Sequence, residues 1–243
     1  MLIKSTSVCI KYKKIDNVKK TYFKNEDMLK DQFNEATVLP IPDDAPVDVP
    51  RIIVKSLHEH SQLNITPIAA NLQINYDAGF EKDWARCEEY INNKMKLVFN
   101  FMNIMTQNEY DYLGIVTDVF MDEYSENGAK ILADNLLKVK PKSGIYDLNA
   151  RYTFVEDQNI FVNIALQNVR IFKEGMSADM AGNLTLQNQV SETIGAVIDI
   201  NDRFGFNCDI NYKTSSSKLN DIIGKMTEVI NTKLNILLTK GEY

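Results

Sequence analysis

Apolar side chains recur at steps of three and four residues in the stretch FEKDWARCEEYINNKMKLVFNFMNIM, from Phe80 to Met105. This spacing places them along one side of an α-helix. At about 1.5 Å of rise per residue the helix is roughly 39 Å long, so it needs a broad apolar surface to lie on. The apolar stripe consists of Phe80, Trp84, Cys87, Ile91, Met95, Val98, Met102 and Met105.

A second stretch near the end of the sequence has the same helical spacing. Ser215, Ser216 and Ser217 offer side-chain oxygens that cap a helix start. The apolar positions that follow are Leu219, Ile222, Met226, Ile230, Leu234 and Leu237. The pattern predicts a second long helix, and a shorter helix is predicted from about Asn25 through Phe33.

Alternation of apolar and polar residues predicts strands elsewhere in the chain. The predicted strands are 5–13, 51–57, 63–77, 110–122, 145–155, 158–172 and 193–200. The segments 145–155 and 158–172 form the clearest hairpin, with a turn from Glu156 to Asn159. One apolar and one polar side per strand is typical of an antiparallel sheet with one covered face.

These elements predict an α+β fold, in which a curved antiparallel sheet is covered by two long helices. A proline-rich link, VLPIPDDAPVDVPR, is expected to be extended and exposed. No flexible linker divides the chain, so residues 1–243 are predicted to be one domain. The similar junctions LQINYDAGF and VIDINDRFGF leave open a pseudo-repeat with halves 1–122 and 123–243.

The charge balance narrows the class of partner. The net charge is −6, with five arginines against twenty-two lysines, which argues against a nucleic-acid backbone as the main partner. Six lysines nevertheless crowd the first predicted strand and the loop after it: Lys11, Lys13, Lys14, Lys19, Lys20 and Lys24. We interpret them as protection of an edge strand, with a face for an acidic partner or nucleic acid as the alternative.

The cysteines and the hydropathy pattern indicate a cellular location. Cys9, Cys87 and Cys208 lack the CxxC spacing and lie beside apolar residues, as free thiols of a reducing compartment do. No uncharged run of transmembrane length and no signal-peptide pattern is found. The sequence therefore predicts a cytoplasmic protein that does not span a membrane.

The two histidines, His58 and His60, form the principal metal-site candidate. In an extended segment they project from the same face and can share a metal ion, as in a metal-dependent hydrolase. A third ligand is not marked by spacing, although Asp77 and Cys9 are candidates. The alternative interpretation is two polar residues at the end of a strand.

Other chemistry is weakly represented. Asp43, Asp44 and Asp48 have the oxygens that a hard cation prefers, but not the spacing of a calcium loop. Asp118 and Asp122 share a strand face, yet the lysine of common two-metal nucleases is missing. With no Walker loop and no GxGxxG motif, the sequence predicts no catalytic residues and no cofactor.

Phe99 and Met102 are the predicted partner-binding residues. Phe99 lies off the main apolar stripe of the long helix, which indicates burial on a second side, by the C-terminal helix or by a second subunit. The methionines at this spacing also fit an adaptable binding groove, with plain core packing as the alternative.

The order of elements, with strands such as YLGIVTDVF and VIDIND and a final turn such as NILLT, resembles a sporadically distributed family of uncharacterised prokaryotic proteins. The resemblance implies an α+β protein found in mobile or defence-associated gene neighbourhoods, without assigned catalytic residues. The chain departs from that family in lacking an arginine-rich strand at Tyr112 to Phe120.

Together these observations predict a non-enzymatic interaction or regulatory protein of the cytosol, and the resemblance implies a bacterial defence or mobile-element system. It is expected to bind a protein partner and to form a homodimer through a helix face or a sheet edge. A module binding a hydrophobic ligand between helix and sheet is one alternative, and the His58/His60 hydrolase is another.

Overall fold

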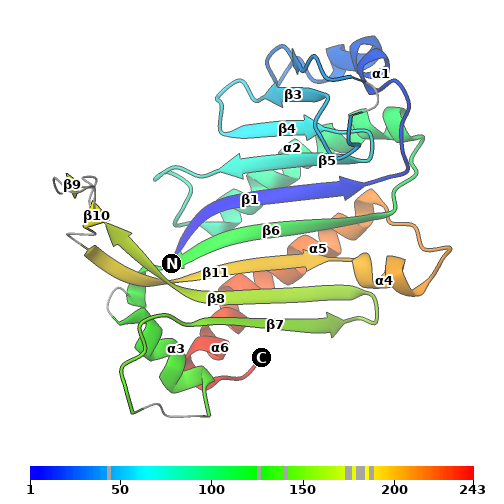
Figure 1. The fold of residues 1–243 in the computed structure, drawn as a ribbon. Coiled ribbons are helices and arrows are strands. Elements are labelled where there is room, and N and C mark those ends of the chain that lie inside the picture. The colour runs from blue at the N-terminus through cyan, green and yellow to red at the C-terminus, as the bar shows by residue number, and fades with distance from the viewer. Residues whose placement is uncertain (43–44, 125–126, 139–141, 173–176, 179–183, 186–188) are drawn as a thin grey trace.

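The computed structural model of the chain describes residues 1–42, 45–124, 127–138, 142–172, 177–178, 184–185 and 189–243. The strands form a large antiparallel sheet, and the long helices lie behind it in Figure 1. The predicted α+β class with an antiparallel sheet is confirmed. In the described ranges, no helix has both the length and the apolar character that crossing a membrane requires.

The large sheet contains nine strands in the described residues, in the order β2-β3-β4-β5-β1-β6-β11-β8-β7, and all neighbours are antiparallel. The strands are β1 Leu2–Lys11, β2 Thr37–Val38, β3 Ile52–Lys55, β4 Ser61–Ile65, β5 Ala69–Asn75, β6 Tyr112–Met121, β7 Asn149–Glu156, β8 Ile160–Phe172 and β11 Gln189–Asn201. A separate short pair consists of β9 Ser177–Ala178 and β10 Leu184–Thr185.

The helical elements differ widely in length. They are α1 Val18–Asn25, η1 Glu26–Met28, α2 Trp84–Thr106, η2 Asp122–Tyr124, α3 Gly128–Leu136, α4 Arg203–Cys208, α5 Ser216–Glu228, η3 Val229–Lys233 and α6 Leu234–Lys240. The C-terminal run from α5 to α6 is continuous, and η3 is a π-helical turn within it.

The alternation of side chains separates a dry face of the sheet from a wetter one. In β6, Leu113, Ile115 and Val119 are buried, while Val116 and Asp118 between them are only half-buried. Successive residues of a strand point to opposite faces, so one face packs against the helices and the other carries no helix in the part of the chain that the structure describes. Figure 1 is seen from the uncovered side.

Helix α2 buries its apolar stripe in the core of the protein. Every predicted stripe residue from Trp84 to Met105 is buried, and Phe80, which precedes the helix, is half-buried. The helix begins at Trp84 because the Asp83 side chain accepts a hydrogen bond from the backbone N–H of Arg86 (3.2 Å). The Trp84 indole donates to Thr227 Oγ1 of α5 (2.7 Å), which joins the two helices.

The predicted strand from Leu63 to Asp77 is wrong, because the chain turns within it and forms β4 and β5. The side-chain oxygen of Thr66 accepts hydrogen bonds from the N–H groups of Ile68 (3.1 Å) and Ala69 (2.8 Å). Thr66 N–H also donates to the carbonyl of Ala69. This local bonding closes a tight turn around Pro67, which has no N–H to give to a sheet.

The predicted start of the first helix is also wrong. Asn25 is the last residue of α1, and its side chain donates to the carbonyl of Thr21 (2.9 Å). The helix begins after Asn17, whose φ of 58° lies in the left-handed region that asparagine tolerates. Asparagine is favoured in both positions, so sequence alone did not distinguish them.

Strand β1 lies in the centre of the sheet, paired with β5 on one side and β6 on the other. Lys11, for example, is opposite Ala69 of β5 and Tyr112 of β6. The interpretation of the six nearby lysines as protection of an edge strand is therefore wrong. The clustering of these lysines around the end of β1 therefore has a cause other than edge protection.

A group of charged residues fastens β7 to the C-terminal helices. Glu156 accepts hydrogen bonds from Lys225 (2.6 Å), Lys233 (2.8 Å) and the Tyr243 hydroxyl (2.7 Å). The Tyr243 ring also stacks on Phe154 with 3.7 Å between ring centroids. Burial alone raises the pKa of Glu156, but the three donors outweigh it and lower the pKa to about 2.

Loss of this carboxylate is expected to weaken folding in a pH-dependent way. The pKa of Glu156 is lower in the folded than in the unfolded chain, so its contribution is complete above about pH 4.5 and is lost as the pH falls toward 2. Glu156→Gln should reduce the free energy of unfolding by about 2 kcal/mol at neutral pH. Urea titrations between acid and neutral pH measure this difference.

The matched control is Glu228→Gln, because Glu228 contacts the same Lys233 but has a side chain that is 54% exposed. Its effect should be much smaller. Equal effects of the two substitutions at neutral pH would contradict the role assigned to Glu156.

Two glycines are expected to respond in opposite directions to alanine. A Cβ at Gly114 would lie 2.6 Å from Asn201 Cβ, whereas at exposed Gly224 in α5 nothing lies within 4 Å. Gly114→Ala should therefore destabilise the fold by about 1–3 kcal/mol. Gly224→Ala should stabilise it by about 0.5–1 kcal/mol. Chemical denaturation checks both values, and a Gly114→Ala chain as stable as the parent would contradict the packing described here.

Candidate functional site

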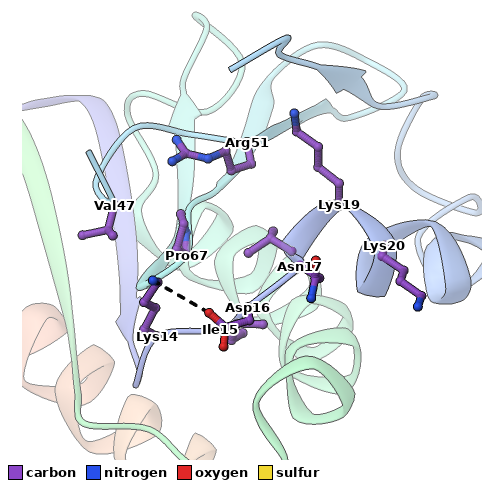
Figure 2. Close-up of a pocket in the computed structure, with 10 residues that line it drawn as sticks. Lys14, Ile15, Asp16, Asn17, Lys19, Lys20, Val47, Arg51 and Pro67 are labelled. Carbon is purple, nitrogen blue, oxygen red and sulfur yellow. Dashed lines mark ion pairs between the residues drawn. The ribbon is translucent and has the colours of Figure 1, made fainter. Parts of the chain in front are cut away.

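A cationic pocket lies where β1 leads into α1 (Figure 2). Its volume is about 560 Å³. The lining residues are Lys14, Ile15, Asp16, Asn17, Val18, Lys19, Lys20, Val47, Arg51 and Pro67. They come from the β1–α1 loop, the first turn of α1, the proline-rich link and the β4–β5 turn.

Hydrogen bonds to backbone carbonyl groups hold these segments together. Ile15 N–H donates to the carbonyl of Pro67 (2.8 Å), which ties the β1–α1 loop to the β4–β5 turn. Arg51, only 5% exposed, donates to the carbonyls of Val49 (2.8 Å) and Ala45 (3.0 Å). Lys19 Nζ donates to the carbonyl of Ile41 (3.3 Å). The proline-rich link therefore forms one wall of the pocket, and Lys19 and Arg51 hold it in place by donating hydrogen bonds to its carbonyl groups.

The pocket carries an excess of positive charge. Among the described lining residues four are cationic, Lys14, Lys19, Lys20 and Arg51, and one, Asp16, is acidic. Asp16 lies 3.8 Å from Lys14, with both side chains more than half exposed, so the ion pair is weak. In a chain of net charge −6, this balance among the described lining residues is of the kind that attracts anionic groups.

On the uncovered face of the sheet, polar side chains form hydrogen bonds with one another. Ser5 donates to Asp118 across β1 and β6 (2.6 Å), and Ser7 donates to Asn71 across β1 and β5 (2.6 Å). Asn201 donates to Asp199 along β11 (2.8 Å). Because these side chains satisfy one another, the face tolerates water without a covering layer.

A groove of about 500 Å³ lies between α2 and α5, with Met95, Phe99 and Leu219 among its lining residues. Its other lining residues are Asn92, Lys96, Asn100, Asn103, Ser216, Ser217 and Asn220. The predicted partner-binding residues differ in their places. Phe99 contributes to the groove but is only 4% exposed, and Met102 is fully buried in the core. Neither offers much surface to a partner in this conformation, and their role stays a prediction.

His58 and His60 lie in the turn between β3 and β4, where Glu59 has a φ of 58°. The extended backbone assumed for this segment is therefore wrong. His58 is exposed, while His60 Nε2 lies 3.9 Å from Asp77 Oδ2. Cys9 is far along β1, opposite Asn71.

Acidic residues do not complete a metal site in the part of the chain that the structure describes. There, no group of three or more His, Cys, Asp or Glu side chains is arranged to hold a metal ion. Asp118 is bonded to Ser5, and Asp122 to the N-terminal amine. Asp43 and Asp44 lie outside the described residues, so the acidic-loop interpretation stays a prediction.

The sequence marked part of the pocket and missed the rest. Lys14, Lys19 and Lys20 were recognised as a basic cluster. Arg51 and Pro67 were not associated with them, because their proximity depends on the pairing of β1 with β5. The available signal in the sequence was the proline-rich link, because its prolines cannot donate hydrogen bonds while its carbonyl groups can accept them from nearby cations such as Arg51.

Comparison with known proteins gives no functional assignment. The sequence matches no protein-family model, and it matches no curated protein at a significant level. The resemblance to the sporadically distributed prokaryotic family therefore stays a prediction, and function is inferred from the geometry of the chain.

Proposed function

We propose that this chain is a non-enzymatic interaction protein, and that its cationic pocket binds an acidic segment of a protein partner. The observation that carries the proposal is the concentration of Lys14, Lys19, Lys20 and Arg51 around one cavity of a chain with net charge −6. Complementary charge of this kind guides association and orients the partner.

The position of the lysines supports a binding role over a structural one. Lys14 and Lys20 are exposed, and β1 has no free edge for them to protect. The pocket also presents apolar surface from Ile15, Val47 and Pro67. A peptide segment with carboxylates and an apolar side chain matches this combination better than a small inorganic anion does.

Two groups with displaced pKa values have a structural role outside the cationic pocket. Glu156 and Tyr243 have strongly displaced pKa values, lowered and raised respectively, and they are bonded to each other. Burial is the largest cause of the rise for Tyr243. Both groups are engaged in holding β7 to the C-terminal helices, and neither lines the cationic pocket.

The alternatives have less support. A hydrophobic-ligand module needs space between the sheet and α2, where Met95, Phe101 and Met102 are at most 1% exposed. A hydrolase using His58 and His60 needs further ligands or a base beside them, and Asp77 is the nearest carboxylate described for His60.

We also propose three further features. Three free cysteines favour a reducing compartment such as the cytoplasm, and a bacterial defence or mobile-element system is proposed from the family resemblance alone. The third feature is a pseudo-repeat: outward from the central pair, β1 is followed by β5, β4 and β3, and β6 is followed by β11, β8 and β7, with the short β2 as an addition to the first half. The central pair β1 and β6 then starts each half, which moves the boundary from residue 122 to the segment between α2 and β6.

The pocket is tested by charge reversal. Lys14→Glu combined with Lys20→Glu should weaken binding of a short fluorescein-labelled, glutamate-rich peptide about tenfold, because two attractive charges become repulsive. Fluorescence anisotropy at low and physiological ionic strength gives the dissociation constants. Binding should weaken with added salt.

The matched control reverses Lys24 and Lys82, two exposed lysines outside the pocket lining. It changes the net charge equally and should leave most of the binding intact. Equal weakening in both double variants would overturn the proposal, as would tighter binding of a thymidine oligonucleotide of matched charge.

A further inference from the structure

The two edges of the large sheet are unequal. At one edge β2 and β3 are only two and four residues long, and Pro40, Pro42 and Pro50 lie beside them. At the other edge β7 is eight residues long and contains no proline. Short strands and prolines prevent a sheet from pairing with another chain. The β7 edge lacks both devices, and Figure 1 shows no strand beyond it.

The register of the hairpin determines which groups β7 presents outward. Asn168 N–H donates to the carbonyl of Leu148. The backbone N–H and C=O groups of Leu148, and of every second residue after it, therefore point toward β8. The backbone N–H and C=O groups of Asn149, Arg151, Thr153 and Val155 therefore point away from the sheet. Among the described residues no backbone hydrogen bond joins these groups to another segment.

The side chains at this edge are less covered than those of the core. Val155 is 47% exposed, and Tyr152 and Phe154 are half-buried. The bonds from Glu156 to Lys225 and Lys233 and the stacking of Tyr243 on Phe154 hold the strand in place. A strand that is already ordered loses little conformational freedom when it pairs.

We infer that β7 pairs antiparallel with β7 of a second copy of this chain, which makes one continuous sheet across a two-fold axis. The strand is self-complementary in the register that places Thr153 opposite Thr153 of the other copy. Tyr152 then lies opposite Phe154, and Arg151 opposite Val155, once on each side of the axis. Aromatic and threonine pairs stabilise antiparallel strands, and no like charges face each other.

The interface is independent of the cationic pocket, which lies toward the opposite edge of the sheet (Figure 1). It therefore goes beyond the proposed function, and failure of peptide binding would not affect it. Pairing of one strand buries less than the roughly 1,200–2,000 Å² of a stable interface, so the dimer should dissociate on dilution.

Sedimentation velocity of the full chain from about 1 to about 200 µM is expected to show a monomer–dimer equilibrium. Thr153→Pro removes an outward N–H at the axis without removing a backbone hydrogen bond to β8. It also removes the exposed side-chain bond from Thr153 Oγ1 to Asn163 of β8 (2.9 Å), which Thr153→Val removes as well. The fold should be kept and association weakened at least about tenfold. Thr153→Val keeps the N–H and should associate like the parent. Circular dichroism verifies the fold of each variant, and Val155→Lys replaces Thr153→Pro if the latter does not fold.

Cross-linking tests the register. In a Cys208→Ser background, which removes the exposed thiol, Thr153→Cys should form a disulfide dimer, because directly opposed residues have Cα atoms about 5.5 Å apart. Arg151→Cys should not, since the two copies of that position are separated by about 13 Å along the strands.

A chain that stays monomeric at the highest concentration would overturn the inference. Undiminished association of folded Thr153→Pro would do the same, and so would cross-linking through position 151 in place of 153.

Discussion

The fold depends on the burial of one face of the sheet beneath two lines of helical side chains. In the longer strands of the sheet, apolar and polar residues alternate so that the apolar side chains point to the same face. Helices α2 and α5 cover that face. Each large apolar side chain removed from water contributes roughly 1.5–3 kcal/mol. This one-sided burial leaves the other face to polar pairs such as Ser5 with Asp118.

The periodicity that creates this layer was readable in the sequence, and it located α2, the β7–β8 hairpin and the C-terminal helices. The errors arose where local hydrogen bonding overrides periodicity. Thr66 closes a turn with its own side chain, and Asn17 adopts a left-handed conformation before α1. Helix α4 was not predicted at all, because six residues are too few to establish a helical period.

The candidate pocket was harder to predict than the fold, for a geometric reason. The basic cluster at Lys14 to Lys20 is local in sequence, but Arg51 reaches it only through pairing of strands that are distant along the chain. Strand order is a long-range property that alternation does not determine. Because strand order is not determined by alternation, the sequence did not reveal that β1 is central, and the predicted edge-protecting role of the lysines was wrong for this reason.

The central position of β1 has a consequence for synthesis on the ribosome. Strand β1 is synthesised before its partner β6, which extends to Met121. One side of β1 is therefore unpaired in the nascent chain while the helices and strands between β1 and β6 are already available. Contacts so distant in sequence close slowly. During that interval the unpaired flank of β1 is open to chaperones or to neighbouring nascent chains, and arrival of β6 ends this exposure.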